Sequence, residues 1–168
     1  MSATTSFPMQ NRPVITAGVM GKDRRFHQIR GLLDTGNDIT LLTRAASTEL
    51  GFSKADTKGV FKVKGIAAAP LNFYMVKTGI KIGQSTPIQA NVGLQLDGST
   101  DTLRDNLFGR KDILDNFDLY FSKGTVSLHK TGVGVGNTLG LTLPIVKNEI
   151  PAGYKSNVGI LCNLANIC

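Results

Sequence analysis

The chain has 168 residues, enough for one domain of ordinary size that buries a core. Its composition of 41% hydrophobic and 18% charged residues is typical of a globular protein and excludes a disordered chain, and its apolar runs are too short to predict a membrane-spanning helix. The net charge of +7 is spread along the chain without zinc-ligand spacing, a phosphate loop or interleaved aromatic residues, which disfavours direct nucleic-acid binding.

The alternation of apolar and polar residues predicts many short strands separated by turns. Residues 1–11 are polar and turn-rich, and we expect a flexible N-terminal arm there. Strands are predicted over 12–20, 26–33, 39–42, 60–63, 71–75, 79–83, 88–94, 118–121 and 125–128. A short helical segment is predicted over 43–50 and another over 110–117. This pattern predicts an all-β fold, a small closed β-barrel with one short C-terminal helix.

The composition changes beyond Lys130. Glycines interrupt the apolar residues there at four closely spaced positions, Gly132, Gly134, Gly136 and Gly140. We therefore expect a domain over 12–130 and a Gly-rich linker with a C-terminal extension over 131–168. Both cysteines, Cys162 and Cys168, lie in this extension without a neighbouring histidine, a pattern that favours free thiols over a metal site. No metal site and no cofactor are predicted.

The triplet Asp34-Thr35-Gly36 lies between two apolar segments, 31–33 and 39–42. A lone triplet of this kind is common by chance and can be an ordinary turn between strands. The apolar flanks predict instead that one strand enters the triplet and another leaves it. Because glycine permits a tight turn, the Asp34 carboxylate would be turned out of the sheet and held from both sides.

Two further patches follow the triplet in order. Val63-Lys64-Gly65-Ile66-Ala67-Ala68-Ala69 carries a glycine between two predicted strands, and Leu107-Phe108-Gly109-Arg110 precedes the second helical segment. Together with the triplet, these patches resemble the flap, the start of the C-terminal helix and the active-site loop of the retropepsins, the retroviral-type aspartic proteases. Related transposon-encoded and cellular domains share the pattern. The resemblance spans about two thirds of the chain.

The resemblance implies an aspartic endopeptidase of the acid-protease type with Asp34 as its catalytic residue. This chemistry needs two carboxylates about 3 Å apart that share one proton, since like charges so close cannot both ionise. The ionised carboxylate acts as general base on water, and the protonated one polarises the scissile carbonyl. The chain has no second Asp-Thr-Gly or Asp-Ser-Gly. A single-lobe homodimer is therefore implied, with Asp34 and its mate meeting on the two-fold axis.

The resemblance also assigns roles to the neighbours of Asp34. Thr35 would bond to its mate across the dimer, and Gly36 would offer backbone groups near the substrate. Asp38 would contact the substrate main chain and form an ion pair with Arg110. The two parallel N–H donors of the Arg110 guanidinium suit a partly buried carboxylate. Asn37 stands where the family usually has alanine, so its side chain would line the substrate site or bond the loop.

In the flap, Gly65, Ile66 and Ala67 would supply backbone donors over an extended peptide or polyprotein substrate, which binds as an added strand. The tip holds less glycine than is usual in the family, which favours a less mobile flap.

Three functions remain open on the sequence. The first is a homodimeric endopeptidase that processes a viral or transposon polyprotein, the second a cellular retropepsin-like protease with a narrow regulatory substrate, and the third a dimerisation or peptide-binding module with little turnover. Residues 1–11 lack a basic segment followed by an apolar one, so we expect no secretory signal and a protein that is intracellular (cytoplasmic) or particle-associated. His27 and His129 lie far apart in the sequence, which disfavours a Ser-His-Asp hydrolase.

Overall fold

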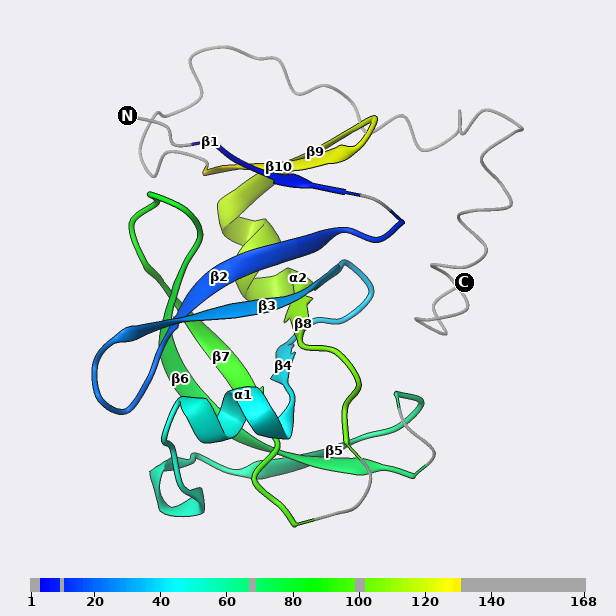
Figure 1. Ribbon diagram of the computed structural model, residues 1–168. Helices are drawn as coiled ribbons and strands as arrows, with labels where there is room; N and C mark the ends of the chain where they lie inside the picture. Colours follow the sequence, from blue (N-terminus) through cyan, green and yellow to red (C-terminus); the bar gives the residue numbers. More distant parts are fainter. Residues whose placement is uncertain (1–3, 10, 67–68, 99–101, 131–168) are drawn as a thin grey trace. The chain divides into compact units, whose positions relative to one another are not determined.

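The computed structural model describes residues 4–9, 11–66, 69–98 and 102–130. Its strands are β1 (Thr4–Pro8), β2 (Val14–Met20), β3 (Phe26–Asp34), β4 (Thr40–Leu42), β5 (Val60–Val63), β6 (Leu71–Lys81), β7 (Ile88–Leu94), β8 (Leu107–Gly109), β9 (Phe117–Ser122) and β10 (Thr125–Lys130) (Figure 1). The helical segments are α1 (Arg44–Glu49), η1 (Lys54–Asp56), α2 (Arg110–Ile113) and η2 (Leu114–Asn116). The predicted extension over 131–168, with both cysteines, lies outside the described residues. No helix in the described part has the length and apolar character to cross a membrane.

Six strands form a closed barrel in the order β2-β3-β8-β4-β7-β6. The barrel closes because the end of β6 pairs back onto β2 at Val19↔Ile80. β5 pairs with the start of β6, from Leu71 to Tyr74, on the edge of β6 that faces away from β7. The pairs β3–β8 and β4–β7 are parallel, whereas the remaining neighbours are antiparallel. The prediction of an all-β fold with a small closed barrel and little helix is confirmed.

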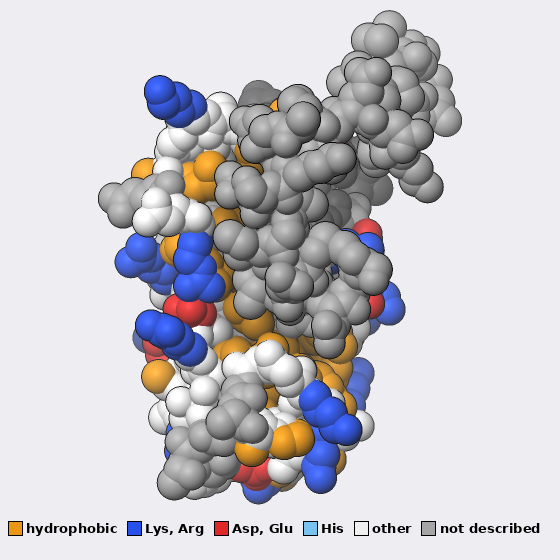
Figure 2. Space-filling view, turned by 90° about the vertical axis from the view of Figure 1, so that its right-hand side faces the viewer, with side chains coloured by type: hydrophobic (Ala, Val, Ile, Leu, Met, Phe, Trp, Pro, Cys, Tyr) orange, Lys and Arg blue, Asp and Glu red, His pale blue; other side chains and the backbone are white. Residues whose placement is uncertain are grey.

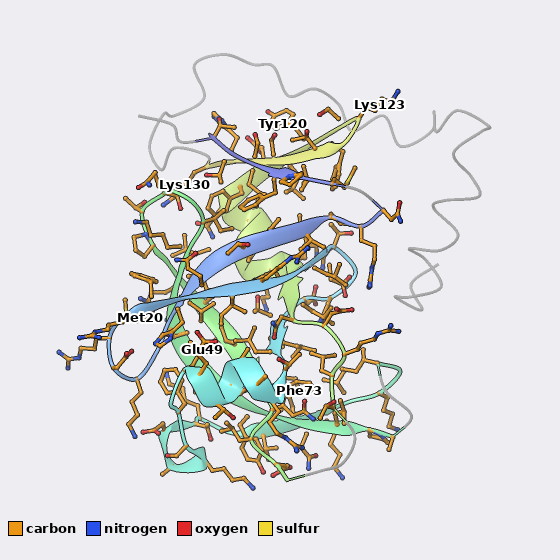
Figure 3. All side chains as sticks on the ribbon, viewed as in Figure 1. Met20, Glu49, Phe73, Tyr120, Lys123 and Lys130 are labelled. Atoms are coloured by element: carbon orange, nitrogen blue, oxygen red, sulfur yellow. The ribbon has the colours of Figure 1, made fainter. Side chains whose placement is uncertain are left out.

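Alternation along the strands fills the barrel. In β3, Ile29 and Leu33 are buried, whereas Gln28 and Arg30 point outward and are exposed. A larger cluster of buried side chains comes from the barrel strands and continues to β10 through Val126 and Leu128. A smaller cluster lies toward β5 and consists of Leu41, Leu71, Phe73, Leu103 and Leu107; Phe73 is labelled in Figure 3. Each fully buried Leu or Phe side chain contributes about 1.5–3 kcal/mol to the free energy of unfolding.

A second, three-stranded sheet has the order β1-β10-β9. The expected flexible arm over residues 1–11 therefore contains a strand, since β1 pairs antiparallel with β10 from Thr4↔His129 onward. Phe7 packs against the barrel core, and this burial together with the pairing of the β10 edge orders the segment. Tyr120, on β9, is 59% exposed (Figure 3).

Two other elements differ from the predicted ones. The strands predicted over 71–75 and 79–83 form one continuous strand, β6, because β5, β7 and β2 pair with successive parts of it. The segment 107–109, predicted only as the start of a helix, is the short strand β8, and the helical segment begins at Arg110. That segment ends at Asn116, where the 3-10 turn η2 gives way to β9.

Candidate active site

Asp34 is the last residue of β3, at the point where the chain leaves the barrel. Parallel pairing with β8 sets its position, with Leu32 opposite Leu107 and Asp34 opposite Gly109. The half-buried Asp34 accepts the N–H of Gly36 on Oδ1 at 3.0 Å, and its carbonyl accepts the N–H of Asn37 at 3.3 Å. These bonds form an Asx-type turn that fixes the direction of the carboxylate.

The loop after Asp34 is fastened to the start of α2. The N–H of Arg110 donates to the carbonyl of Asn37 at 2.6 Å, and the N–H of Lys111 donates to the carbonyl of Asp38 at 3.0 Å. The first N–H groups of a helix have no partner within the helix, so the loop supplies acceptors that they need. The Asn37 side chain accepts the N–H of Ile39 at 3.4 Å and is thus engaged with its own loop.

Gly109 is required where β8 passes the exit of this loop. A Cβ added there would lie 2.4 Å from the carbonyl carbon of Ile39 and 2.5 Å from its oxygen. The N–H of Gly109 also donates to the buried hydroxyl of Thr40 at 3.2 Å. The backbone on both sides of Asp34 is therefore held against β8 without room for a side chain at position 109.

Asp38 and Arg110 lie in contact, with Nη2 of Arg110 2.6 Å from Oδ1 of Asp38. Both side chains are well exposed, at 61% for Asp38 and 59% for Arg110. The partial burial expected for this carboxylate is absent in the single chain, because the loop and α2 present the pair to solvent. An exposed pair of this kind contributes about 0.2–1 kcal/mol. Thr35, at the tip of the same loop, is also exposed.

The hairpin β5–β6 carries the predicted flap residues on the side of the molecule that bears the loop after β3 (Figure 1). Gly65 has a φ of +84°, a left-handed conformation that favours glycine. Ile66 packs against the smaller apolar cluster, as do Leu32 and Ile39, which flank the Asp34 loop. The hairpin and the loop thus share one apolar surface. Ala67 lies outside the described residues.

Asp97 anchors the base of this hairpin. Its carboxylate accepts bonds from Lys54 at 2.6 Å, from the Tyr74 hydroxyl at 2.7 Å and from the Asn72 amide at 2.9 Å. These hydrogen bonds, that of Lys54 foremost, lower the pKa of Asp97 to about 2. Because Asn72 and Tyr74 belong to β6, the network ties the flap strand to the end of β7.

Asn106 is a positioning residue that the sequence analysis missed. Its side chain accepts the N–H of Thr43 at 2.8 Å and donates to the carbonyl of Arg30 at 2.9 Å, and its own carbonyl accepts the N–H of Leu32 at 2.8 Å. Asn106 thus connects the segment directly before β8 with β3 and with the start of α1 through hydrogen bonds. Its place directly before the 107–110 motif is the one signal in the sequence, and alone it does not indicate this role.

Charge is dispersed over the side that carries the loop and the flap. Figure 2 shows Lys and Arg side chains scattered there, with acidic side chains among them and hydrophobic side chains exposed between. The described residues contain no group of three His, Cys, Asp or Glu side chains placed to hold a metal ion.

Comparison with known proteins supports the architecture. No protein-family model matches the chain, and no curated protein matches it in sequence. The structure is similar to the crystal structure of a retropepsin-like aspartic protease from Rickettsia conorii, with a TM-score of 0.57 and 16% sequence identity. The similarity covers 77% of this chain and 92% of that chain. At this identity the similarity shows the fold, and the activity has to be argued from the site.

Proposed function

We propose that this chain, which has a retropepsin-like fold, is an aspartic endopeptidase that acts as a homodimer with Asp34 as its catalytic residue. The observation that carries the proposal is the mounting of the Asp34 carboxylate. The carboxylate lies at the C-terminal end of β3 and accepts the N–H of Gly36. The loop that follows is hydrogen-bonded to the start of α2, and the backbone of Gly109 lies in close contact with it. Such fixed geometry is what a catalytic carboxylate needs, because misplacement by about 1 Å costs on the order of a hundredfold in rate.

Two Asp34 carboxylates, one from each subunit, form the catalytic pair in this mechanism. The ionised carboxylate removes a proton from a bound water, which attacks the scissile carbonyl carbon. The protonated carboxylate donates a hydrogen bond to the carbonyl oxygen and stabilises the tetrahedral intermediate. A proton then passes to the leaving amine as the C–N bond breaks. The Asp34–Gly36 bond keeps each carboxylate in place during these steps.

The loop surface supports the proposed dimer. Thr35, at the loop tip, is exposed in the single chain, and the nearby side chains of Asp38 and Arg110 are about 60% exposed although they contact each other. A second copy that met this surface would bring two Asp34 residues together and remove the ion pair from water. Thr35 would then bond to its mate, as the resemblance implies.

The substrate in this proposal is an extended peptide bound between the Asp34 loop and the flap. Half-buried apolar side chains, among them Leu32, Ile39 and Ile66, surround this space and would contact substrate side chains. The backbone at Gly65 and beyond would pair with the peptide as an added strand. Polyprotein processing is the first candidate role. A cellular protease with a narrow regulatory substrate is the second candidate role.

Cleavage of a peptide library by the purified full chain tests the proposal. We expect the wild type to cut peptides and Asp34→Asn to lose that activity while it keeps the fold, because the amide oxygen can still accept the Gly36 N–H but cannot act as a base. Asp118→Asn, the same change at an exposed position on β9, is the matched control and should cut at the wild-type rate. Cleavage by Asp34→Asn at more than a few per cent of wild type would refute the assignment.

A further inference from the structure

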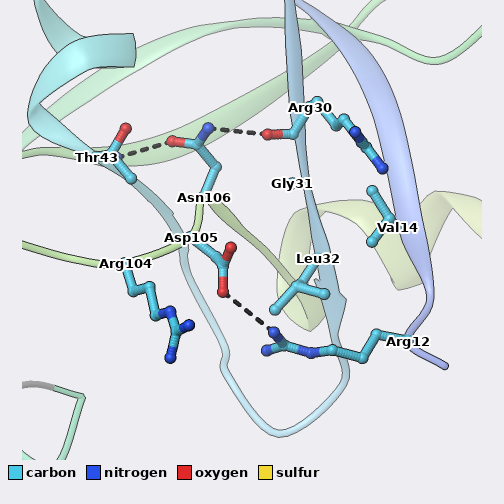
Figure 4. A pocket seen from close by; sticks show the side chains of 9 residues that line it. All are labelled: Arg12, Val14, Arg30, Gly31, Leu32, Thr43, Arg104, Asp105 and Asn106. Atoms are coloured by element: carbon cyan, nitrogen blue, oxygen red, sulfur yellow. Dashed lines mark hydrogen bonds and ion pairs between the residues drawn. The ribbon is translucent and has the colours of Figure 1, made fainter.

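An open cleft of about 410 Å³ lies beside the strand that ends in Asp34 (Figure 4). Three of the side chains that line it are arginines, Arg12, Arg30 and Arg104. Asp105 is the only acidic residue in the lining, and it is bound to Arg12 with an N–O distance of 3.2 Å. Three guanidinium groups and one carboxylate leave the cleft with a net charge of +2. Its wall is therefore strongly basic.

Strand geometry connects this cleft to the catalytic residue. Arg30, Leu32 and Asp34 are alternate residues of β3, so their side chains point to the same face, whereas Ile29, Gly31 and Leu33 are buried. Leu32 and Arg30, both in the cleft lining, are about 7 Å and about 13 Å along the strand from Asp34. The longer distance equals about four residues of an extended peptide.

The cleft is held in shape by backbone contacts. Asn106 bonds to Arg30 and Thr43, as the dashed lines in Figure 4 show, and its carbonyl accepts the N–H of Leu32. A Cβ added at Gly31 would lie 2.5 Å from the Asn106 carbonyl oxygen, so the two chain segments lie in close contact. The segment that carries Arg104 and Asp105 is thereby fixed beside β3.

Two of the arginines are available to a ligand. Arg30 and Arg104 are exposed, and among the described residues neither forms an ion pair with an acidic side chain. Guanidinium groups bind carboxylates through paired hydrogen bonds, a match of both charge and shape. An apolar substrate side chain is disfavoured in this cleft, because it would displace water from the exposed guanidinium groups without offering them hydrogen bonds.

We infer that this cleft is a specificity site that binds an acidic side chain of the substrate, an Asp or Glu within about four residues of the scissile bond. The inference rests on the proposed function and extends it to the class of substrate. Arg30 and Arg104 are the specificity-determining residues, and Arg12 is largely occupied by Asp105.

The test uses the full-length chain and a peptide library in which each position varies. We expect enrichment of Asp and Glu at one fixed position among the cleaved peptides. For a cleaved Glu peptide and its Gln counterpart, kcat/KM should favour Glu by about tenfold, and higher salt should reduce that ratio because the cleft is open to solvent.

Three variants assign the preference to the cleft. Arg30→Gln combined with Arg104→Gln should bring the ratio of the Glu to the Gln peptide close to one. Arg30→Glu combined with Arg104→Glu leaves one arginine and three carboxylates in the lining and should reverse the preference toward a Lys peptide. Arg24→Gln combined with Arg25→Gln, the same loss of two charges in the exposed turn between β2 and β3, should keep the wild-type ratio.

The outcomes separate the inference from the proposed function. If no peptide is cut in an Asp34-dependent way, the proposed function falls and the inference falls with it. If cleavage depends on Asp34 but shows no preference for an acidic residue, or keeps its preference in the Arg30 and Arg104 variants, the inference alone is overturned.

Discussion

Substitution of Gly109 by alanine should disrupt the attachment of the Asp34 loop. The added Cβ would lie 2.4 Å from the carbonyl carbon of Ile39, where ordinary contact begins at 3.4 Å, so the two backbones would have to separate by about 1 Å. Neither side can move by rotating a side chain, because the atoms in conflict belong to the backbone. Gly109 is in addition paired with Asp34 and bonded to Thr40.

Overpacking of a buried site costs about 1–3 kcal/mol, and a conflict with backbone belongs at the upper end, so we expect Gly109→Ala to lower the free energy of unfolding by about 3 kcal/mol. Urea unfolding measures this loss as a midpoint lower by roughly 1–3 M. Peptide cleavage in the folded fraction should also fall, on the order of a hundredfold.

Gly98→Ala is the matched control for Gly109→Ala. A Cβ added at Gly98 would meet nothing within 4 Å, so the free energy of unfolding of Gly98→Ala should stay within about 0.5 kcal/mol of wild type. If Gly109→Ala were as stable as the Gly98 control, the close passage of β8 against the loop exit would be refuted.

Three other predictions concern the ion pair, a histidine and the chain end. Asp38 and Arg110 are exposed in the single chain, so a double-mutant cycle on stability should give a coupling free energy below about 1 kcal/mol in dilute protein. At concentrations where dimers form, the coupling free energy should be larger. An equal coupling at all concentrations would contradict burial of the ion pair in a dimer. The pKa of His27 is raised above 6.5, first by its hydrogen bond with Asp23 and then by Glu49, so its stabilising effect is full below pH 6.5 and is lost as the pH rises through the raised pKa. His27→Gln should therefore lower the urea midpoint more at about pH 5.5 than at about pH 8.5, and an equal loss at both would contradict this linkage. Residues 1–130 should fold and cut peptides, since β10 ends at Lys130; loss of both the unfolding transition and turnover would assign residues 131–168 to the enzyme.

The sequence predicts those helices and strands whose formation is determined by the residues within them and directly beside them. The strand predicted over 60–63 is β5 and that over 88–94 is β7, because alternating side chains suffice to order them against the core. The helix after Thr43 likewise begins and ends at residues with capping character, Thr43 and Gly51.

Features that depend on distant partners could not be predicted. β1 is ordered by pairing with β10, more than a hundred residues away in the sequence. β8 is three residues long and is a strand only because β3 and β4 lie on either side of it. The role of Asn106 likewise depends on where the chain brings Arg30 and Thr43.

In the candidate site, too, the features set by local sequence could be predicted and those set by distant partners could not. The sequence predicts that Asp34 sits between two strands and that Asp38 meets Arg110, because short motifs with recognisable flanks carry both expectations. The exposure of that ion pair depends on how the loop and α2 pack, which no motif encodes. The basic cleft was missed for the same reason, since Arg12, Arg30 and Arg104 are widely spaced in the sequence.

Mixing of wild-type and Asp34→Asn subunits tests the central claim most directly, that one active site needs Asp34 from two chains. At a fixed total concentration, with subunits allowed to exchange, activity should follow the square of the wild-type fraction, so an equal mixture retains about a quarter of the wild-type rate. An equal mixture that retains about half of the rate would mean that each chain carries a complete site, and the homodimeric mechanism would be contradicted.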